Sequence, residues 1–268
     1  MHSVPIVERI KKTFAPPRPA DRILADIHLH AVLPRLTDLV RLDAEAKSLA
    51  ADMKMTLEFV VRGGPRAFLT FDRGTVKAGR TGCSDVGLLF LDCATLNRMF
   101  AGDKVTPIPF KGFTLIRQLK KFERLTEVLT RYLKPSDADM ADPAFRKKHV
   151  ELSLLVGLAA CRSIADHDRK AERAAAALHE GTIQYSIQPE GPDAVVTIRH
   201  GAIEVAAGKV PEPSATIELK DVDFAVALIR GEVDTFAANG SGEVRVSGDL
   251  HLADEFNHLF DRVGFYLK

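Results

Sequence analysis

Tryptophan is absent from the 268-residue sequence, and cysteine occurs only three times. Cys83, Cys93 and Cys161 are odd in number and lack Cys-x-x-Cys spacing, which argues against a disulfide framework and against a cysteine zinc site. Unpaired thiols are typical of a reducing compartment, so we expect a cytoplasmic protein. Such a chain depends on an ordinary apolar core, for which its 46% content of hydrophobic residues is ample.

An excess of one charge and long apolar runs are also missing. The formal net charge is +1, so the composition gives no reason to expect a nucleic-acid partner. The most apolar segment, residues 150–165, is interrupted by Glu151, Ser153 and Arg162 and is too short to cross a membrane. The basic start of the chain lacks the apolar stretch of a secretory signal. We therefore expect residues 150–165 to form a buried helix.

The motifs of several common catalytic classes are absent as well. The sequence contains no nucleophile elbow, no P-loop and no Rossmann fingerprint. We predict no catalytic residue, no metal site and no cofactor, and hence a protein that is not an enzyme.

The clearest pattern that is present lies at the end of the chain. Residues 215–220 alternate apolar and polar side chains, as in a strand with one buried face, and Asp221 follows where a helix N-cap is expected. Gly231 ends that helix. Residues 244–248 predict a second short strand, and Asp249 can cap the helix that follows. This last helix carries an apolar stripe at helical spacing: Leu252, Phe256, Leu259, Phe260, Val263 and Leu267.

The second half of the sequence repeats the first. Pro65 and Pro192, for example, are 127 positions apart. An ordered series of such matches with small changes of spacing is typical of duplication with insertions in loops. Further pairs are Ala67/Ala194, Thr70/Thr197 and Gly74/Gly201 at 127, Asp92/Asp221 and Gly102/Gly231 at 129, Gly112/Gly248 at 136, and Phe122/Phe256, Leu125/Leu259 and Tyr132/Tyr266 at 134.

A polar, acidic segment at residues 135–142 separates the two copies. We predict an N-terminal arm at residues 1–20, a first domain at residues 21–137 and a second domain at residues 138–268. The apolar residues 150–164 are expected to pack one copy against the other.

The motif order of the second copy resembles the C-terminal half of the sterol carrier protein (type two) lipid-binding domain. The shared features are a strand, an acidic helix start before Phe224, Gly231 at the helix end, the Gly-x-Val-x-Val-x-Gly-Asp pattern of residues 242–249 and an apolar last helix. The resemblance covers nearly all of residues 53–134 and 180–268. It implies an α+β fold of two sterol-carrier-like domains, each a five-stranded, mostly antiparallel sheet covered by helices.

The resemblance also implies a function, which is non-catalytic binding or transfer of a lipid. The ligand, a fatty acyl chain, an acyl-CoA, a sterol or a phospholipid, would lie in an apolar tunnel between sheet and helices. The same side chains are also the expected core of such a fold. The predicted lipid-binding residues are Phe224, Leu228, Phe236, Val244, Val246, Leu252, Phe256, Leu259 and Phe260.

The second copy is the predicted ligand site because the first copy has a shorter loop. Nine residues separate Gly102 from Gly112, whereas sixteen separate Gly231 from Gly248. We expect the first copy to have a structural or partner-binding role.

Two alternatives remain open from the sequence. An accessory or scaffold protein would present a substrate to a separate enzyme, or bind that enzyme, with no open pocket of its own. A metal-dependent hydrolase would use Asp26, His28 and His30, whose spacing is like the metal-binding strand end of amidohydrolases. The apolar spacing around these residues favours a helix instead, on which the two histidines would be about 200° apart.

A basic amphipathic helix is predicted at residues 114–133. Such a face is usually solvated, and it can also contact an anionic membrane transiently. Its cationic residues are Arg117, Lys120, Lys121, Arg124 and Arg131.

Overall fold

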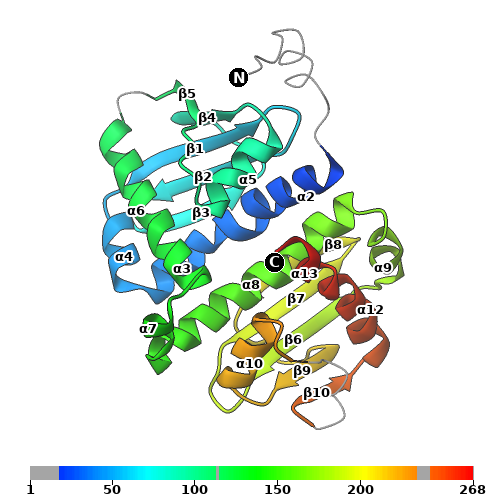
Figure 1. The fold of residues 1–268 in the computed structure, drawn as a ribbon. Coiled ribbons are helices and arrows are strands. Elements are labelled where there is room, and N and C mark those ends of the chain that lie inside the picture. Colours follow the sequence, from blue (N-terminus) through cyan, green and yellow to red (C-terminus); the bar gives the residue numbers. More distant parts are fainter. Residues whose placement is uncertain (1–17, 113–114, 234–241, 268) are drawn as a thin grey trace, which may run out of the picture.

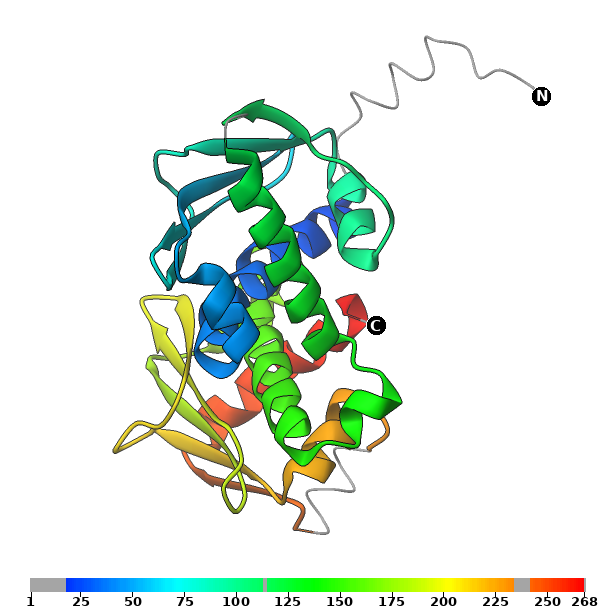
Figure 2. The same cartoon turned by 90° about the vertical axis from the view of Figure 1, so that its left-hand side faces the viewer.

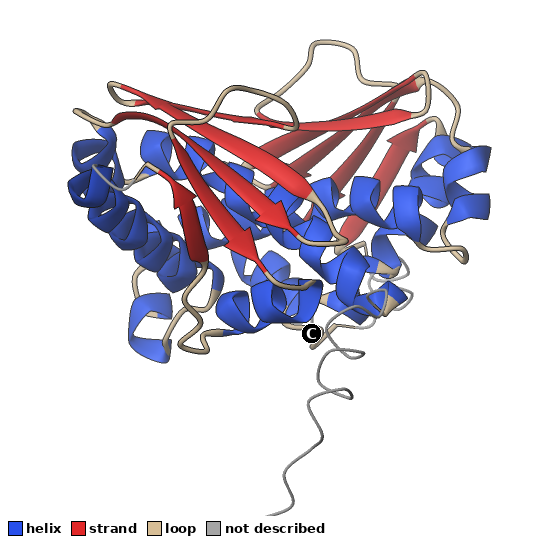
Figure 3. Ribbon diagram, turned by 90° about the horizontal axis from the view of Figure 1, so that it is seen from above, coloured by secondary structure: helices blue, strands red, loops and turns tan. Residues whose placement is uncertain are grey.

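The computed structural model describes residues 18–112, 115–233 and 242–267. Two five-stranded sheets, each with its own helices, occupy the upper and lower parts of the molecule (Figure 1). Both sheets lie on one side and most of the helices on the other (Figures 2 and 3). The predicted α+β fold with two helix-covered sheets is confirmed.

The first half contains the elements that build the first sheet and its helical cover. They are α2 (Pro19–Ile27), the π-helical turn η1 (His28–Val32), the 3-10 turn η2 (Leu33–Arg35), α3 (Leu36–Leu42), α4 (Ala44–Ala50), β1 (Lys54–Val61), β2 (Arg66–Asp72), β3 (Thr75–Gly79), β4 (Val86–Phe90), α5 (Cys93–Ala101), β5 (Ile108–Lys111) and α6 (Ile116–Leu133).

The second half contains a similar series of elements. They are α7 (Asp137–Met140), α8 (Pro143–His167), α9 (Glu172–Ala177), β6 (Gly181–Ile187), β7 (Asp193–Arg199), β8 (Ala202–Ala207), β9 (Ala215–Leu219), α10 (Val222–Ile229), β10 (Val244–Gly248), α12 (Leu250–Asp261) and α13 (Val263–Tyr266).

The two sheets have the same topology. Their strand orders are β3-β2-β1-β4-β5 and, read in the matching direction, β8-β7-β6-β9-β10. In each sheet only the central pair, β1 with β4 or β6 with β9, is parallel, and the other pairs are antiparallel. The sheets are therefore mixed, with antiparallel pairing in the majority.

Residues matched between the halves also adopt matching conformations. Asp92 and Asp221 are both helix N-caps, and the side chain of each accepts a hydrogen bond at 2.7 Å from the backbone N–H three residues later. Gly112 and Gly248 have φ angles of 84° and 83°, a region that favours glycine. Residues that the repeat pairs in the sequence thus occupy equivalent positions in the two halves.

Helix α8 lies between the two halves (Figure 1). It contacts α2, η1, α3 and α6 of the first half, and β7, β8, α10 and α12 of the second. Neighbours on several sides explain why residues 150–164 of this 25-residue helix are mostly apolar and buried. The expectation that residues 150–164 form a buried helix between the copies is confirmed.

The first half has a broken helix where the second half has α8. The α-helix that begins at Pro19 passes into the π-helical turn η1 and the 3-10 turn η2, and α-helix resumes at Leu36. Pro34 lies within η2 and lacks a backbone N–H, which removes one helical hydrogen bond there.

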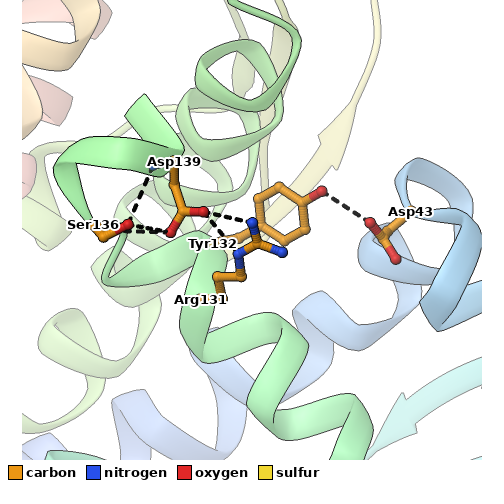
Figure 4. A network of polar contacts seen from close by, with 5 residues as sticks. All are labelled: Asp43, Arg131, Tyr132, Ser136 and Asp139. Atoms are coloured by element: carbon orange, nitrogen blue, oxygen red, sulfur yellow. Dashed lines mark hydrogen bonds and ion pairs between the residues drawn. The ribbon is translucent and has the colours of Figure 1, made fainter. Parts of the chain in front are cut away.

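A polar network joins the end of α6 to its neighbours (Figure 4). The hydroxyl of Tyr132 donates a hydrogen bond of 2.9 Å to Asp43 Oδ2, at the N-cap of α4. Arg131 donates to Asp139 Oδ1 at 2.6 and 2.9 Å, and Ser136 forms a capping box with the same carboxylate. These contacts hold the C-terminal end of α6 in place at the point where the chain passes from the first half to the second.

In the part of the chain that the structure describes, no helix is both long and apolar enough to cross a membrane.

Candidate functional site

The turn between β10 and α12 is specified by its sequence. The side chain of Asp249 accepts a hydrogen bond of 3.0 Å from Leu252 N, which caps α12, and a second of 2.7 Å from Nε2 of His179. The backbone bond from Leu252 is the main cause that lowers the pKa of Asp249, and His179 adds to it. Gly248 precedes this cap, and a Cβ there would lie 2.4 Å from the carbonyl oxygen of Ser214.

Four of the predicted lipid-binding residues are buried in the core between sheet and helices. Leu252, Phe256 and Leu259 are completely inaccessible to solvent, and Phe224 is 8% exposed. The ring of Phe256 lies edge-on to that of Tyr185 on β6, with the centroids 6.4 Å apart. These side chains fill the interface in which the sequence predicted a tunnel.

Four further predicted residues are half-buried at the margin of this core. Val244 and Val246 lie on the edge strand β10, and Leu228 lies on α10. Phe260 reaches across to α8, where a Cβ on Gly157 would lie 2.9 Å from its ring. The ninth residue, Phe236, lies outside the described residues.

A surface hollow of about 390 Å³ lies between β10 and α12. Its apolar wall consists of Val246, Leu250 and Ala253, and Leu250 is 60% exposed. The polar lining residues are His251, Asp254 and Asn257. We call this the β10–α12 hollow.

The buried phenol of Tyr185 connects the core to the β10–α12 hollow. Its hydroxyl lies 3.5 Å from Oδ1 of Asn257, a lining residue on α12. Burial raises the pKa of Tyr185 well above its ordinary value, and its neutral hydroxyl is the hydrogen-bond donor in this contact. The amide group of Asn257 can present its N–H groups to a polar part of a ligand.

Sequence reasoning identified only Val246 among the residues that line the hollow. Leu250 and Asn257 lie off the apolar stripe on which the prediction was based, and Ala253, which borders that stripe and is 1% exposed, was not among the predicted residues. The sequence feature that could have indicated the hollow is Leu250, an apolar residue that directly follows the helix cap and lies outside the stripe.

The corresponding edge of the first sheet is built differently. The pairing of β4 with β5 contains an irregularity between Gly87 and Leu88, whereas β9 pairs with β10 in unbroken register. The ring of Phe110 covers Gly87, where a Cβ would lie 2.3 Å from it. The difference between the two copies that their loop lengths suggested thus extends to the edge strands.

The two histidines of the Asp-x-His-x-His motif have different partners. His28 and His30 lie in the π-helical turn η1, where Nδ1 of His28 is 3.1 Å from Asn97 Oδ1. Nε2 of His30 is 3.6 Å from Asp26 Oδ1. Among the described residues, no group of three His, Cys, Asp or Glu side chains is placed to hold a metal ion.

The basic face of α6 forms ion pairs with neighbouring carboxylates. Lys121 contacts Asp52 at 2.5 Å, Arg124 contacts Glu45 at 2.8 Å, and Arg131 contacts Asp139. The surface available to an anionic membrane is therefore less basic than the sequence predicts.

A family model matches part of the second half. The model of the SCP-2 sterol transfer family matches residues 161–261, a range that includes β6 to β10 and α12. The resemblance to the sterol carrier family is confirmed for this part of the chain. No protein of curated function matches the sequence.

Several solved structures are similar to parts of the chain. Sterol carrier protein 2 like 2 from Aedes aegypti is 16% identical, with 33% of this chain and 88% of that protein covered and a TM-score of 0.26. The sterol carrier protein domain 2 of Helicoverpa armigera is 17% identical, with 42% and 89% covered and a TM-score of 0.32. The sec-alkylsulfatase Pisa1 from a Pseudomonas species is 14% identical, with 54% and 28% covered and a TM-score of 0.26.

Proposed function

We propose that the second half of this protein binds an apolar lipid chain at the β10–α12 hollow and carries it without catalysing a reaction. The observation that carries this proposal is the match of the SCP-2 sterol transfer family to residues 161–261, a range that contains every residue lining the hollow. The division into domains at residues 21–137 and 138–268 is part of the same proposal.

The size and lining of the hollow support an apolar ligand. A volume of about 390 Å³ falls within the range of roughly 300–1,000 Å³ that is usual for small-molecule sites. An acyl chain laid over Leu250 and Val246 would remove their exposed surface from water. Each buried methylene contributes about 0.8 kcal/mol, so a medium-length chain binds firmly without any charged contact.

The polar residues of the hollow suit a lipid with a polar head. His251, Asp254 and Asn257 lie on α12 beside the apolar wall, within reach of a carboxyl, hydroxyl or ester group. We assign the chain to Val246, Leu250 and Ala253 and the head to the polar residues.

The buried members of the predicted set have an indirect role in this proposal. Leu252, Phe256 and Leu259 form the packed layer that supports the apolar wall. Because Phe256 is completely buried, an acidic substitution there would test folding rather than binding. Substitutions on the wall itself are the better probes.

The experiment combines ligand identification with a pair of matched variants. Native mass spectrometry of gently purified protein identifies any lipid retained in stoichiometric amount. Displacement of a fluorescent fatty acid then compares Val246→Glu with Phe110→Glu, which changes the corresponding residue of the first half. We expect Val246→Glu to weaken binding by at least about tenfold and Phe110→Glu to leave it unchanged.

Two results would contradict the proposal. A wild-type protein that retains no lipid and takes up no acyl probe would favour an accessory protein or scaffold without an open pocket. Equal loss of binding in both variants would remove the assignment to the β10–α12 hollow.

A further inference from the structure

A second hollow, of about 160 Å³, lies where η1, η2 and β3 of the first half meet α8. We call it the central hollow. Its polar lining residues are His30, Arg80, Arg162 and Ser163, and the rest of its lining is apolar or glycine. None of the described carboxylates lines it.

Two guanidinium groups that are far apart in the sequence meet at the central hollow. Arg80 follows β3 and Arg162 lies on α8, and both are close to the same oxygen of Asp166. The separations are 3.9 Å for Nη2 of Arg80 and 4.0 Å for Nε of Arg162, longer than hydrogen bonds. Two positive charges thus share one distant carboxylate that is itself 45% exposed.

Two donors at the central hollow have no hydrogen-bond acceptor among the described residues. They are Nε of Arg162 and Oγ of Ser163, both of which are buried. Ser163 is only 1% exposed. Because buried polar groups in native proteins are nearly always hydrogen-bonded, these two donors indicate a ligand with acceptor atoms.

The nearby histidines have a carboxylate partner of their own. Oδ1 of Asp26 lies 3.6 Å from Nε2 of His30 and 3.7 Å from Nε2 of His167. Asp26 itself is not part of the lining of the hollow. Because His30 lies beside the buried carboxylate of Asp26, we assign the ligand to the two arginines and the serine.

We propose that the central hollow binds a phosphate group, held by the guanidinium groups of Arg80 and Arg162 and by the hydroxyl of Ser163. Guanidinium groups form paired hydrogen bonds with oxyanions, and a phosphate monoester offers three terminal oxygens for the donors of both arginines and the serine. The phosphate is either the free inorganic ion or part of a phosphorylated ligand. Its binding would connect the two halves of the protein through one anion.

Titration of the full-length protein with inorganic phosphate at constant ionic strength tests the site. We expect stoichiometric binding by calorimetry and a rise in Tm with phosphate. Arg80→Gln and Arg162→Gln should each weaken binding by at least about tenfold, because each removes a charge-assisted contact. Arg199→Gln, at the exposed end of β7, is the matched control and should bind as the wild type does. Equal binding by all four proteins overturns the proposal, as does the absence of binding of both inorganic phosphate and a phosphorylated lipid.

Ser163→Ala separates binding from folding. The hydroxyl has no partner among the described residues, so its removal should leave the Tm of the phosphate-free protein unchanged. Phosphate affinity should fall by several-fold, roughly the effect of one lost hydrogen bond. An unchanged affinity would remove Ser163 from the site.

A third set of titrations identifies the source of the phosphate. Dihexanoyl phosphatidic acid carries a phosphate monoester on a lipid, and hexanoate carries a carboxylate on a similar chain. Binding of phosphatidic acid but not of inorganic phosphate, lost in Arg162→Gln, assigns the site to a lipid head. Equal affinity for hexanoate overturns the choice of phosphate. Binding of a fluorescent fatty acid at the β10–α12 hollow should be unchanged in Arg162→Gln, so the two proposals fail independently.

Discussion

Tyr266 donates a hydrogen bond of 2.9 Å to Oδ2 of Asp168, and so ties the last helix of the chain to the end of α8. Arg262 donates to the same oxygen at 2.5 and 3.0 Å. The first half contains a counterpart, in which Tyr132 donates to Asp43 at 2.9 Å. Each half thus anchors its last long helical segment to an aspartate through a tyrosine.

We predict that Asp168→Asn destabilises the protein, most strongly at neutral pH. Asp168 is 7% exposed, and its loss of charge would leave Arg262 without its strongest partner. The expected loss in free energy of unfolding is about 2–3 kcal/mol at pH 7, measured by urea denaturation. Asp254→Asn, at an exposed position on α12, is the control and should change stability by less than about 0.5 kcal/mol.

The pH dependence of this effect follows from the pKa of Asp168. Burial favours the protonated form, but hydrogen bonds from Arg262, Lys170 N and Tyr266 outweigh it and lower the pKa below its ordinary value. The stabilisation is present above the unfolded-state pKa of about 4 and is lost as pH falls through the lower native pKa. The difference between wild type and Asp168→Asn should therefore shrink in acid. A difference that stays constant from pH 7 to pH 2.5 would contradict this.

His28 should make the protein less stable in mild acid. Burial lowers its pKa from 6.5 to about 4, although the hydrogen bond with Asn97 opposes the shift. Unfolded chains bind a proton near pH 6.5 and the native state only near pH 4. Stability should therefore decrease as pH falls between these values, by on the order of 3 kcal/mol.

Urea denaturation between pH 4 and pH 7 checks this prediction with two variants. His28→Gln should show a shallower pH dependence of stability than wild type. Part of the pH dependence should remain, because burial also lowers the pKa of His149 and His30. The exposed His258→Gln serves as the control and should follow the wild-type profile. If the stability of wild type and of His28→Gln changes with pH in parallel, a group other than His28 causes the loss of stability in mild acid.

The strands and caps were predictable from sequence because their signals are local. Alternating burial along β9, and the turn that precedes Asp249, depend on residues within a few positions of one another. The repeat placed Tyr132 and Tyr266 at equivalent positions, but it did not identify their partners. Asp43 and Asp168 are 125 positions apart, a spacing outside the series found in the sequence.

The two hollows could not be predicted in the same way because they depend on tertiary packing. The apolar stripe of α12 marks the side chains that reach the core, and a surface hollow is lined by residues beside that stripe. Arg80 and Arg162 are 82 positions apart, and only the packing of α8 against the first half brings them together. The composition of the chain, with a net charge near zero, gives no sign of this local concentration of positive charge.

Gly248 offers a final prediction that links stability to the β10–α12 hollow. Its φ is 83°, and a Cβ would lie 2.4 Å from the carbonyl oxygen of Ser214, so Gly248→Ala combines backbone strain with a collision. Gly231 has a φ of 70° with nothing within 4 Å of a Cβ, and Gly231→Ala therefore adds the strain alone. We expect losses of about 1 kcal/mol for Gly231→Ala and about 3 kcal/mol for Gly248→Ala in urea denaturation.

The collision at Gly248 should also affect the ligand site. To relieve this collision, either β10 must move away from Ser214 or the cap at Asp249 must be displaced. Either movement shifts Val246 relative to α12. Fluorescent fatty acid should therefore bind more weakly to Gly248→Ala than to Gly231→Ala at a temperature where both variants remain folded. Equal affinities together with unequal stabilities would show that the hollow tolerates movement of its edge strand, and the ligand would then have to be held mainly by α12.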